Sequence, residues 1–211
     1  MTAFTAHPVR GRLNAAVFRS VDGYADHLFG ERKRELFAGL PGTVVEIGPG
    51  TGANLRHYRA GTRLVAIEPN PYMHEPLMAN ARRRGVTVDL RAASAEHTGL
   101  DDGEAQAVVS TLVLCTVPDP AAALREIARI LRPGGRLIFV EHVGAARGSG
   151  YDRLQRAVAT PWRWFFEGCE VSRDTEGLLQ AAGFAELSVS RYRVRSVFLP
   201  INTQIAGVAV R

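Results

Sequence analysis

Short runs of apolar residues alternate with longer segments of helical periodicity over the first two thirds of the chain. Five runs are rich in β-branched and aliphatic residues, which predicts five strands. Residues 73–84, and the segment that begins at Asp119-Pro120, instead place apolar side chains on one helical face. Strands that alternate with helices predict a parallel sheet with helices on both faces. The five strand runs are residues 43–47, 63–67, 86–90, 107–113 and 137–140.

The pattern changes at both ends of the chain. Residues 1–40 predict a helical cap, and residues 143–171 form an irregular, aromatic-rich insertion on the substrate side. After a further helix over 172–182, residues 186–193 and 203–210 alternate like two strands, which predicts an antiparallel hairpin. The predicted fold class is therefore α/β: a doubly wound sheet of about seven strands, mostly parallel, with a C-terminal antiparallel hairpin.

Composition adds a basic charge to this picture. The 211 residues, which we expect to form a single domain over 1–211, carry 26 Lys and Arg against 21 Asp and Glu, a net charge of +5. A basic balance suggests nucleic acid as a partner. However, the arginines are scattered, and the only tight basic runs are residues 32–34 and 82–84. We therefore expect a small-molecule acceptor as partner and no nucleic acid, and we leave the oligomeric state open.

Cysteine usage and hydropathy narrow the class further. Cys115 and Cys169 are too few for a disulfide framework or a zinc site, so we expect them to be structural and expect no metal. No apolar stretch approaches about 18 residues, and arginines interrupt the N-terminal segment. These features predict a soluble, cytoplasmic protein.

A glycine loop follows the first predicted strand. Gly48-Pro49-Gly50-Thr51-Gly52 fits the patterns of both dinucleotide-binding and nucleoside-binding loops, so it decides little alone. Glu68 closes the second strand 20 residues after Gly48, where a carboxylate accepts hydrogen bonds from ribose hydroxyls. The loop and Glu68 together predict a nucleoside-containing cofactor.

Glu46, two positions before the loop, separates the candidate cofactors. A carboxylate about 4 Å from a pyrophosphate costs on the order of 4 kcal/mol at an effective dielectric near 20, which disfavours a dinucleotide. A ligand that carries an ammonium and a sulfonium group is instead attracted to this carboxylate. S-adenosylmethionine is such a ligand, although Glu46 can also be solvated or paired with an arginine.

Four motifs follow one another along the chain: Glu46 to Gly52, Ala66-Ile67-Glu68-Pro69, Ala93-Ser94-Ala95-Glu96 and Leu131-Arg132-Pro133-Gly134-Gly135. In this order they resemble the motifs of class I S-adenosylmethionine-dependent methyltransferases, which have a Rossmann-like fold. The resemblance implies that S-adenosylmethionine is bound by Glu46, Gly48, Pro49, Gly50, Gly52, Glu68, Pro69, Ser94, Ala95, Thr111 and Leu112. Ser94 stands where many members have Asp.

A narrower resemblance points to the acceptor. Residues 111–117, Glu141-His142-Val143, Pro161-Trp162, Gly168-Cys169 and Arg173 are similar to the thiol S-methyltransferase (methyltransferase-like protein 7) group, which adjoins the quinone-biosynthesis C-methyltransferases. The resemblance implies S-methylation of a small, apolar thiol. Membrane-associated members carry an apolar N-terminal anchor that this chain lacks, so we expect no stable membrane insertion.

Candidate acceptor-side residues follow the fifth strand. Trp162, Phe165 and Phe166 suit an apolar acceptor, or they form a helix that simply packs on the sheet. His142, at the end of that strand, is a candidate general base, or it is bonded to backbone. Glu96 matches a position where related enzymes carry a functional acid, and an adenine-pocket or surface role fits it equally.

Three other activities stay open at this stage. A C- or O-methyltransferase acting on a quinone or other aromatic metabolite would use the same aromatic residues, with a stronger demand on His142 as base. A dinucleotide-dependent oxidoreductase is opposed by Glu46, and an RNA methyltransferase by the scattered arginines.

Overall fold

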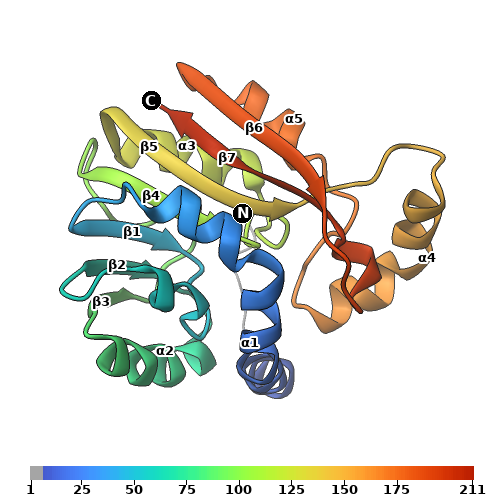
Figure 1. Ribbon diagram of the computed structural model, residues 1–211, viewed down its shortest axis with the longest axis horizontal. Helices are drawn as coiled ribbons and strands as arrows, with labels where there is room; N and C mark the ends of the chain where they lie inside the picture. Colours follow the sequence, from blue (N-terminus) through green and yellow to red (C-terminus); the bar gives the residue numbers. More distant parts are fainter. Residues whose placement is uncertain (1–6) are drawn as a thin grey trace.

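A computed structural model describes residues 7–211 and shows a seven-stranded sheet in the order β3-β2-β1-β4-β5-β7-β6 (Figure 1). The first five strands are parallel to one another, as the alternation of strands and helices predicts. They are β1 (Thr43–Ile47), β2 (Arg63–Ile67), β3 (Thr87–Arg91), β4 (Ala105–Thr111) and β5 (Leu131–His142). The strand order reverses between β1 and β4, which is where open α/β sheets bind ligands at their carboxyl ends.

The predicted C-terminal hairpin is confirmed. β6 (Glu186–Arg193) and β7 (Thr203–Val210) pair antiparallel, and β7 lies between β5 and β6. A short 3₁₀ helix, η2 (Leu199–Ile201), lies in their connection. Because β7 also pairs antiparallel with β5, it turns an otherwise parallel sheet into a mixed one.

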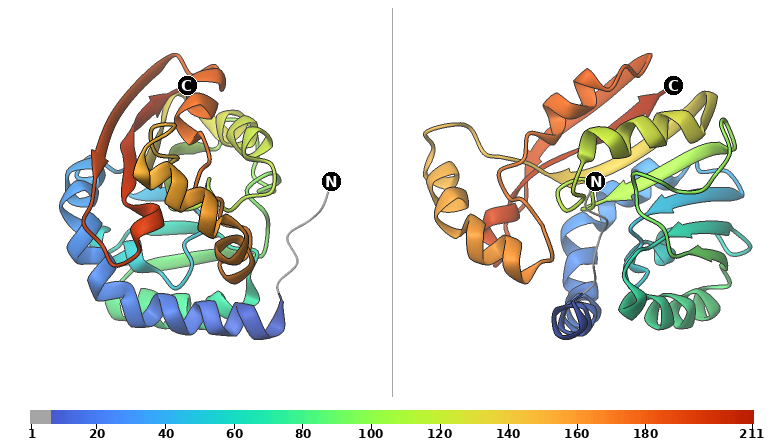
Figure 2. Two further views of the ribbon diagram at one scale, coloured as in Figure 1. Left: turned by 90° about the vertical axis from the view of Figure 1, so that its right-hand side faces the viewer. Right: turned by 180° about the vertical axis from the view of Figure 1, so that it is seen from behind.

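Helices cover both faces of the sheet, and each face has its own apolar core (Figure 2). On one face lie α1 (Pro8–Phe37), the 3₁₀ helix η1 (Ala53–His57) and α2 (Pro71–Arg84). On the other lie α3 (Pro120–Ile130) and α5 (Thr175–Ala181). Val44 and Leu64 pack on the first face, whereas Val45 and Val65 pack on the second, as the period of two in a strand requires.

The helix boundaries follow local signals in the sequence. Asp119 caps α3 by accepting a hydrogen bond from the Ala122 N–H, and Pro120 occupies its first turn. α2 ends at Gly85, which adopts a left-handed conformation with φ 65°. Within residues 1–40, where the sequence predicts a helical cap, α1 covers Pro8–Phe37, and residues 1–6 lie outside the described part.

Residues 143–171 depart from the prediction of an irregular insertion. They contain a 16-residue helix, α4 (Gly150–Phe165), which begins after Ser149, whose side chain accepts from the Asp152 N–H. Glycines around its start and Pro161 inside it obscure the helical period in the sequence. α4 lies beyond the carboxyl end of β5 (Figure 1), where it closes one side of the site.

Candidate functional site

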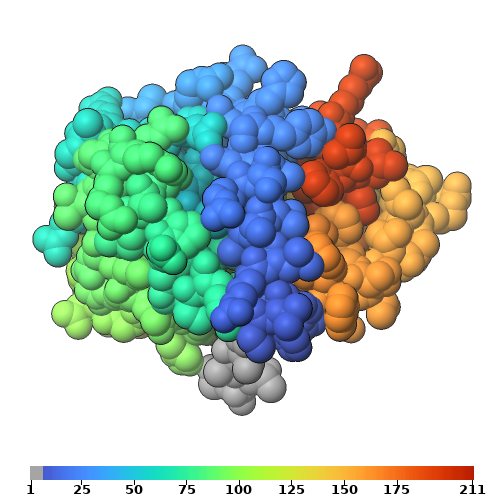
Figure 3. Space-filling model, turned by 90° about the horizontal axis from the view of Figure 1, so that it is seen from below, coloured from blue at the N-terminus to red at the C-terminus, as the bar shows by residue number. Residues whose placement is uncertain are grey.

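A cavity of about 270 Å³ opens at the carboxyl ends of β1, β2, β4 and β5. We call the part beside the glycine loop and Glu68 the donor half, and the part between α1, α4 and His142 the acceptor half. In a space-filling view α1 runs between the α2 side and the α4 side of the molecule (Figure 3). Residues of α1 line the cavity, so this helix forms one of its walls.

The donor half centres on Glu68, which is 5% exposed. Its two carboxylate oxygens accept hydrogen bonds from the backbone N–H groups of Gly50 and Asn70, both at 2.9 Å. Burial raises the pKa of Glu68 to about 7, and these two N–H donors limit the rise. A partner that donates hydrogen bonds or brings positive charge therefore binds the ionised form of Glu68 more tightly than the protonated form.

The glycine loop leaves room for a ligand beside Glu68. Gly50 has φ 56°, and a Cβ added there meets no atom within 4 Å among residues 7–211. Gly48 has φ 59°, and a Cβ there would lie 2.7 Å from a methyl group of Val113. The loop therefore brings bare backbone to the cavity, as the sequence motif predicts.

Glu46 lies in a buried polar cluster behind the loop. Asn54 Nδ2 donates to one of its oxygens at 2.7 Å, and the Tyr58 hydroxyl donates to the other at 2.8 Å. Burial raises the pKa of Glu46 to about 7, and the nearby Lys33, 4% exposed, opposes that rise. Burial in turn lowers the pKa of Lys33 to about 8. Asn54 and Tyr58 already donate hydrogen bonds to the two carboxylate oxygens of Glu46. A direct contact between Glu46 and a ligand therefore stays a prediction.

Most of the predicted cofactor residues meet at the cavity. Those that line it are Gly48, Gly50, Glu68, Pro69, Ser94, Ala95 and Leu112. Glu46, Pro49, Gly52 and Thr111 are not among the described residues that line it. The Thr111 hydroxyl accepts a hydrogen bond from Asn54 at 3.0 Å, which joins it to the Glu46 cluster.

Aromatic side chains of α1 and α4 wall the acceptor half. Trp162 and Phe166 line the cavity with ring centroids 4.4 Å apart, and Phe18 of α1 stacks on Phe166 at 6.3 Å. The predicted Phe165 packs edge-on against Phe166 at 4.8 Å and is not one of the cavity-lining residues found within 7–211. Two predicted aromatics thus face the cavity, and the third supports them.

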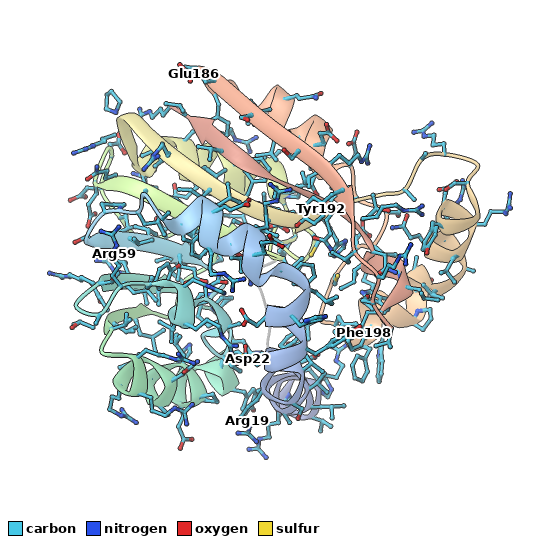
Figure 4. All side chains as sticks on the ribbon, in the orientation of Figure 1. Arg19, Asp22, Arg59, Glu186, Tyr192 and Phe198 are labelled. Atoms are coloured by element: carbon cyan, nitrogen blue, oxygen red, sulfur yellow. The ribbon has the colours of Figure 1, made fainter. Side chains whose placement is uncertain are left out.

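The connection between β6 and β7 closes the remaining side. Phe198, labelled in Figure 4, belongs to this connection and lines the cavity. Its ring centroid lies 6.4 Å from that of Tyr24 in α1. The Tyr24 hydroxyl accepts a hydrogen bond from the Val197 N–H at 3.0 Å. The acceptor half therefore depends on contact between the first helix and the end of the chain.

His142 ends β5, as predicted, and lines the cavity together with two cysteines. His142 Nε2 lies 3.1 Å from Cys169 Sγ, and the two sulfurs of Cys169 and Cys115 lie 3.7 Å apart. The hydrogen bond between the thiols raises the pKa of Cys115 and lowers that of Cys169, and His142 lowers the pKa of Cys169 further. Glu96, the second predicted catalytic residue, lines the cavity and accepts from the Asp119 N–H at 3.2 Å.

Asn70 and Glu167 are two of the cavity residues that the sequence did not predict. Asn70 lines the cavity, accepts from the Tyr72 N–H as the cap of α2 and donates to Glu167 at 3.1 Å. Glu167 has φ 48°, and burial raises the pKa of its carboxyl group. An asparagine directly before Pro71 is a capping signal that indicates Asn70, whereas no local pattern indicates Glu167.

Two residues with strained backbone conformations also line the cavity. Leu112 and Glu167 are the non-glycine residues with positive φ in the described chain, at 56° and 48°, and both line the cavity. Such conformations cost on the order of 1–3 kcal/mol each and concentrate at ligand sites.

The comparisons with known proteins agree with this geometry. A family described as "Methyltransferase domain" matches residues 45–139, which contain the glycine loop and Glu68. The human thiol S-methyltransferase TMT1B is 36% identical over 191 residues, covering 85% of this chain and 78% of its own length. The chain belongs to the S-adenosylmethionine-dependent methyltransferase family. Human thiol S-methyltransferase TMT1A is 33% identical to this methyltransferase with the same coverage of both chains.

Solved structures share the fold of this methyltransferase. A SAM-dependent methyltransferase of Thermotoga maritima, described as a possible histamine N-methyltransferase, superposes with a TM-score of 0.63 at 23% identity, covering 92% of this chain and 93% of its own. The putative methyltransferase from a Haloferax volcanii complex with the activator Trm112 has a TM-score of 0.67 at 19% identity, covering 95% and 96%. The Rossmann-like class predicted from the motifs is thereby confirmed.

S-adenosylmethionine is the methyl donor of this family, and the residues of the donor half fit it. The buried Glu68 suits ribose hydroxyls, and the space beside Gly50 suits a ligand against bare backbone. The dinucleotide-dependent oxidoreductase kept open in the sequence analysis is thereby set aside. Over residues 7–211, none of the helices combines the length and the apolar character needed to cross a bilayer.

Proposed function

We propose that this methyltransferase transfers a methyl group to the sulfur of a small, apolar thiol. The observation that carries the proposal is the likeness to thiol S-methyltransferases, which covers 85% of the chain and so extends well beyond the methyltransferase core at residues 45–139. The acceptor half fits a small apolar molecule because Phe18, Trp162 and Phe166 wall it.

In the donor half, Glu68 would accept the ribose hydroxyls, with Gly48, Gly50 and Pro69 beside it. Ser94 and Ala95 would border the adenine, and Leu112 the methyl-bearing end. The bound donor supplies a methyl group already activated on a sulfonium. The remaining task of the chain is to hold the acceptor in line with that methyl group and to exclude water.

In the acceptor half, deprotonation is the one chemical demand. A thiol with a pKa near 8.5 is partly ionised at neutral pH and is intrinsically nucleophilic, so it needs little help from a base. His142 lies at the inner end of this half and Glu96 also borders the cavity, and their catalytic roles stay predictions.

A second candidate function is C- or O-methylation of a quinol or another aromatic metabolite. The stacked rings of Trp162, Phe166 and Phe18 favour it, because they suit a planar acceptor as well as an apolar thiol. An oxygen or carbon acceptor ionises less readily than a thiol and therefore requires a strong base.

Methyl transfer from labelled donor to matched thiols, catechols and quinols tests the proposal. We expect a small apolar thiol to be methylated about tenfold faster than an oxygen or carbon acceptor of similar size. Reactions without the protein set the background rate. Transfer only to oxygen or carbon would refute the thiol proposal and favour the second function.

The remaining expectations form part of this proposal. We propose a single domain over residues 1–211, a cytoplasmic location and no nucleic-acid partner. Cell fractionation and an RNA-binding assay with the purified protein test the last two.

A further inference from the structure

Three side chains with metal-binding atoms meet at the inner end of the acceptor half. Cys115 follows β4, His142 ends β5 and Cys169 follows α4, and their ligand atoms all lie within 4.8 Å of one another. They are 1%, 1% and 8% exposed, respectively. Because 27 and 54 residues of chain separate Cys169 from the other two, only the tertiary fold forms this Cys₂His cluster.

The spacing of the cluster suits a tetrahedral zinc ion. With Zn–S bonds of about 2.3 Å, two ligating sulfurs lie about 3.8 Å apart. The sulfurs of Cys115 and Cys169 lie 3.7 Å apart. A ligating imidazole nitrogen lies about 3.6 Å from each sulfur, whereas His142 Nε2 is 3.1 Å from Cys169 Sγ. Zinc binding therefore requires the imidazole to withdraw from Cys169 by roughly 0.5 Å, while the third pair, His142 and Cys115, has its ligand atoms within 4.8 Å of each other.

The hydrogen bonds around the cluster support the sulfurs and leave the far side of the imidazole without one. His142 Nδ1 is buried and makes no hydrogen bond to the described chain, so no hydrogen bond holds the ring at its far side. Trp162 Nε1 donates to Cys169 Sγ at 3.3 Å, and the Thr116 hydroxyl lies 3.5 Å from Cys115 Sγ. Hydrogen bonds of this kind orient the ligands of protein metal sites.

The two cysteine segments are held in place by the backbone around them. Glu141 accepts from the Val113 N–H at 3.1 Å, and Arg173 donates to the carbonyls of Leu114 and Val117 at 2.8 and 2.7 Å. The Glu170 N–H donates to the Cys115 carbonyl at 2.8 Å, which joins the two cysteine segments directly. Most of the ligand geometry therefore exists before any ion binds.

We infer that Cys115, His142 and Cys169 bind one Zn²⁺ ion whose fourth position faces the cavity and takes the sulfur of the acceptor. Three protein ligands with one open position is the arrangement of catalytic zinc. Two thiolates balance the charge of Zn²⁺, which suits a buried, largely apolar site. All three residues line the cavity, so the open position faces the space assigned to the acceptor.

The role in the reaction rests on the proposed function. The acceptor thiol loses its proton to solvent as its sulfur takes the fourth position, which keeps it a thiolate at neutral pH. That sulfur forms a bond to the methyl carbon while the bond from methyl to the donor sulfonium breaks, and the bonding electron pair stays on the departing sulfur. The products are a methyl thioether, S-adenosylhomocysteine and one proton. In the zinc-bound protein His142 acts as a ligand, which replaces the free-base role predicted from the sequence.

Direct metal binding tests the site without any acceptor. The full-length protein, kept reduced with a phosphine and stripped with a chelator, is titrated with Zn²⁺ against a chromophoric competitor. We expect one zinc per chain and an affinity reduced by about 100-fold or more in Cys115→Ser and in Cys169→Ser. His27→Ala, which removes an exposed histidine of α1, serves as the matched control and should bind zinc unchanged. Absence of stoichiometric zinc, or equal binding by the double serine variant, would overturn the site.

Cobalt substitution decides the question even if a serine variant fails to fold. Cobalt bound by two thiolates gives sulfur-to-metal charge-transfer absorption, whereas cobalt bound only through nitrogen and oxygen does not. The unaltered protein should show this absorption, and its absence would refute the ligand set.

The zinc site and the proposed thiol methylation can be refuted independently of each other. We expect zinc removal to slow thiol methylation about tenfold or more while leaving donor affinity unchanged. An unchanged rate overturns the role of zinc but not thiol methylation. Stoichiometric zinc without methylation of any thiol refutes the proposed function but leaves the metal site intact.

Discussion

The two halves of the cavity differ in how far apart along the chain their interacting residues lie. In the donor half, Glu68 accepts from backbone groups that lie 18 and 2 residues away. In the acceptor half, the Asn14 side chain of α1 donates at 2.9 Å to the Phe165 carbonyl, 151 residues later. The donor half is thus a local product of strands and turns, whereas the acceptor half exists only after the two ends of the chain have come together.

The chemistry of the halves differs in the same way. Buried carboxylates whose pKa lies near 7 dominate the donor half, and backbone N–H groups and short side-chain contacts satisfy them. Aromatic rings, two thiols and one imidazole dominate the acceptor half. We therefore expect changes in the donor half to act on donor binding and on pH dependence, and changes in the acceptor half to act on the acceptor alone.

Gly48→Val should break the donor half most completely. A β-branched residue at φ 59° is strained, and its Cβ would collide with Val113 at 2.7 Å. We expect a cost of about 4 kcal/mol, divided between stability and donor binding, so that calorimetry detects no donor binding at micromolar concentrations. Gly42→Ala, at a position with open space, is the matched control. Wild-type donor affinity in Gly48→Val would mean that the loop does not contact the donor.

The buried carboxylates should make stability fall with rising pH. The pKa of Glu46 is raised to about 7 in the folded protein, so between about pH 4.5 and 7 the folded state binds more protons than the unfolded state, and stability decreases through that window. Glu46→Gln should remove on the order of 3 kcal/mol of this decrease. Urea unfolding at pH 5 and pH 7.5 measures it, with the exposed Glu186→Gln as control. An unchanged slope would show that Glu46 stays ionised throughout.

Glu68→Ala should weaken donor binding by about tenfold, because it removes a charged acceptor for the ribose hydroxyls. In the unaltered protein, donor affinity should rise between pH 6 and 8 as Glu68, with its pKa near 7, ionises. This rise should be smaller in Glu68→Ala. Calorimetry across this range measures both effects, and equal affinity of the two proteins would contradict the ribose assignment.

Phe18→Ala should give the smallest effect and should act only on the acceptor half. The ring stacks on Phe166 and is partly exposed, so its loss should raise the KM of an apolar thiol by about fivefold and leave donor affinity unchanged. Val9→Ala, at an exposed site on the same helix, is the control. A parallel loss of donor affinity in Phe18→Ala would show that the two halves are coupled through α1.

Sequence reasoning performed best where a residue's role depends on its near neighbours. β1 and β2 match the predicted runs at 43–47 and 63–67, and the hairpin matches 186–193 and 203–210. Apolar alternation and flanking turn residues are local signals, and for these elements the tertiary structure did not override them. α4 was missed because Gly148, Gly150 and Pro161 resemble loop residues, although Ser149 caps a helix that packs against η2.

The residues of the candidate site also divide into those predicted from local motifs and those brought together only by folding. Glu68, Gly48 and Gly50 were predicted from motif spacing and line the cavity. Cys115 and Cys169 were expected to be structural because no short spacing links them, yet folding brings their sulfurs to within 3.7 Å of each other. Glu167 carried no signal at all, since its interactions come from distant parts of the chain: Asn70 donates a hydrogen bond to it, and Arg10 of α1 opposes the rise in its pKa.

The order of residues along the chain was sufficient to predict a parallel α/β sheet with a glycine loop and an acidic strand end, and hence a nucleoside-containing cofactor. The resemblance of its four motifs to class I methyltransferases added S-adenosylmethionine as the methyl donor. Those features depend on backbone conformation and on contacts between adjacent strands, which short sequence patterns encode. Only the tertiary structure brought α1, α4 and the β6–β7 connection around the acceptor, and brought two cysteines and a histidine together. These contacts join residues 27 to 173 positions apart and leave no periodic trace in a single sequence, because packing rather than local propensity selects them.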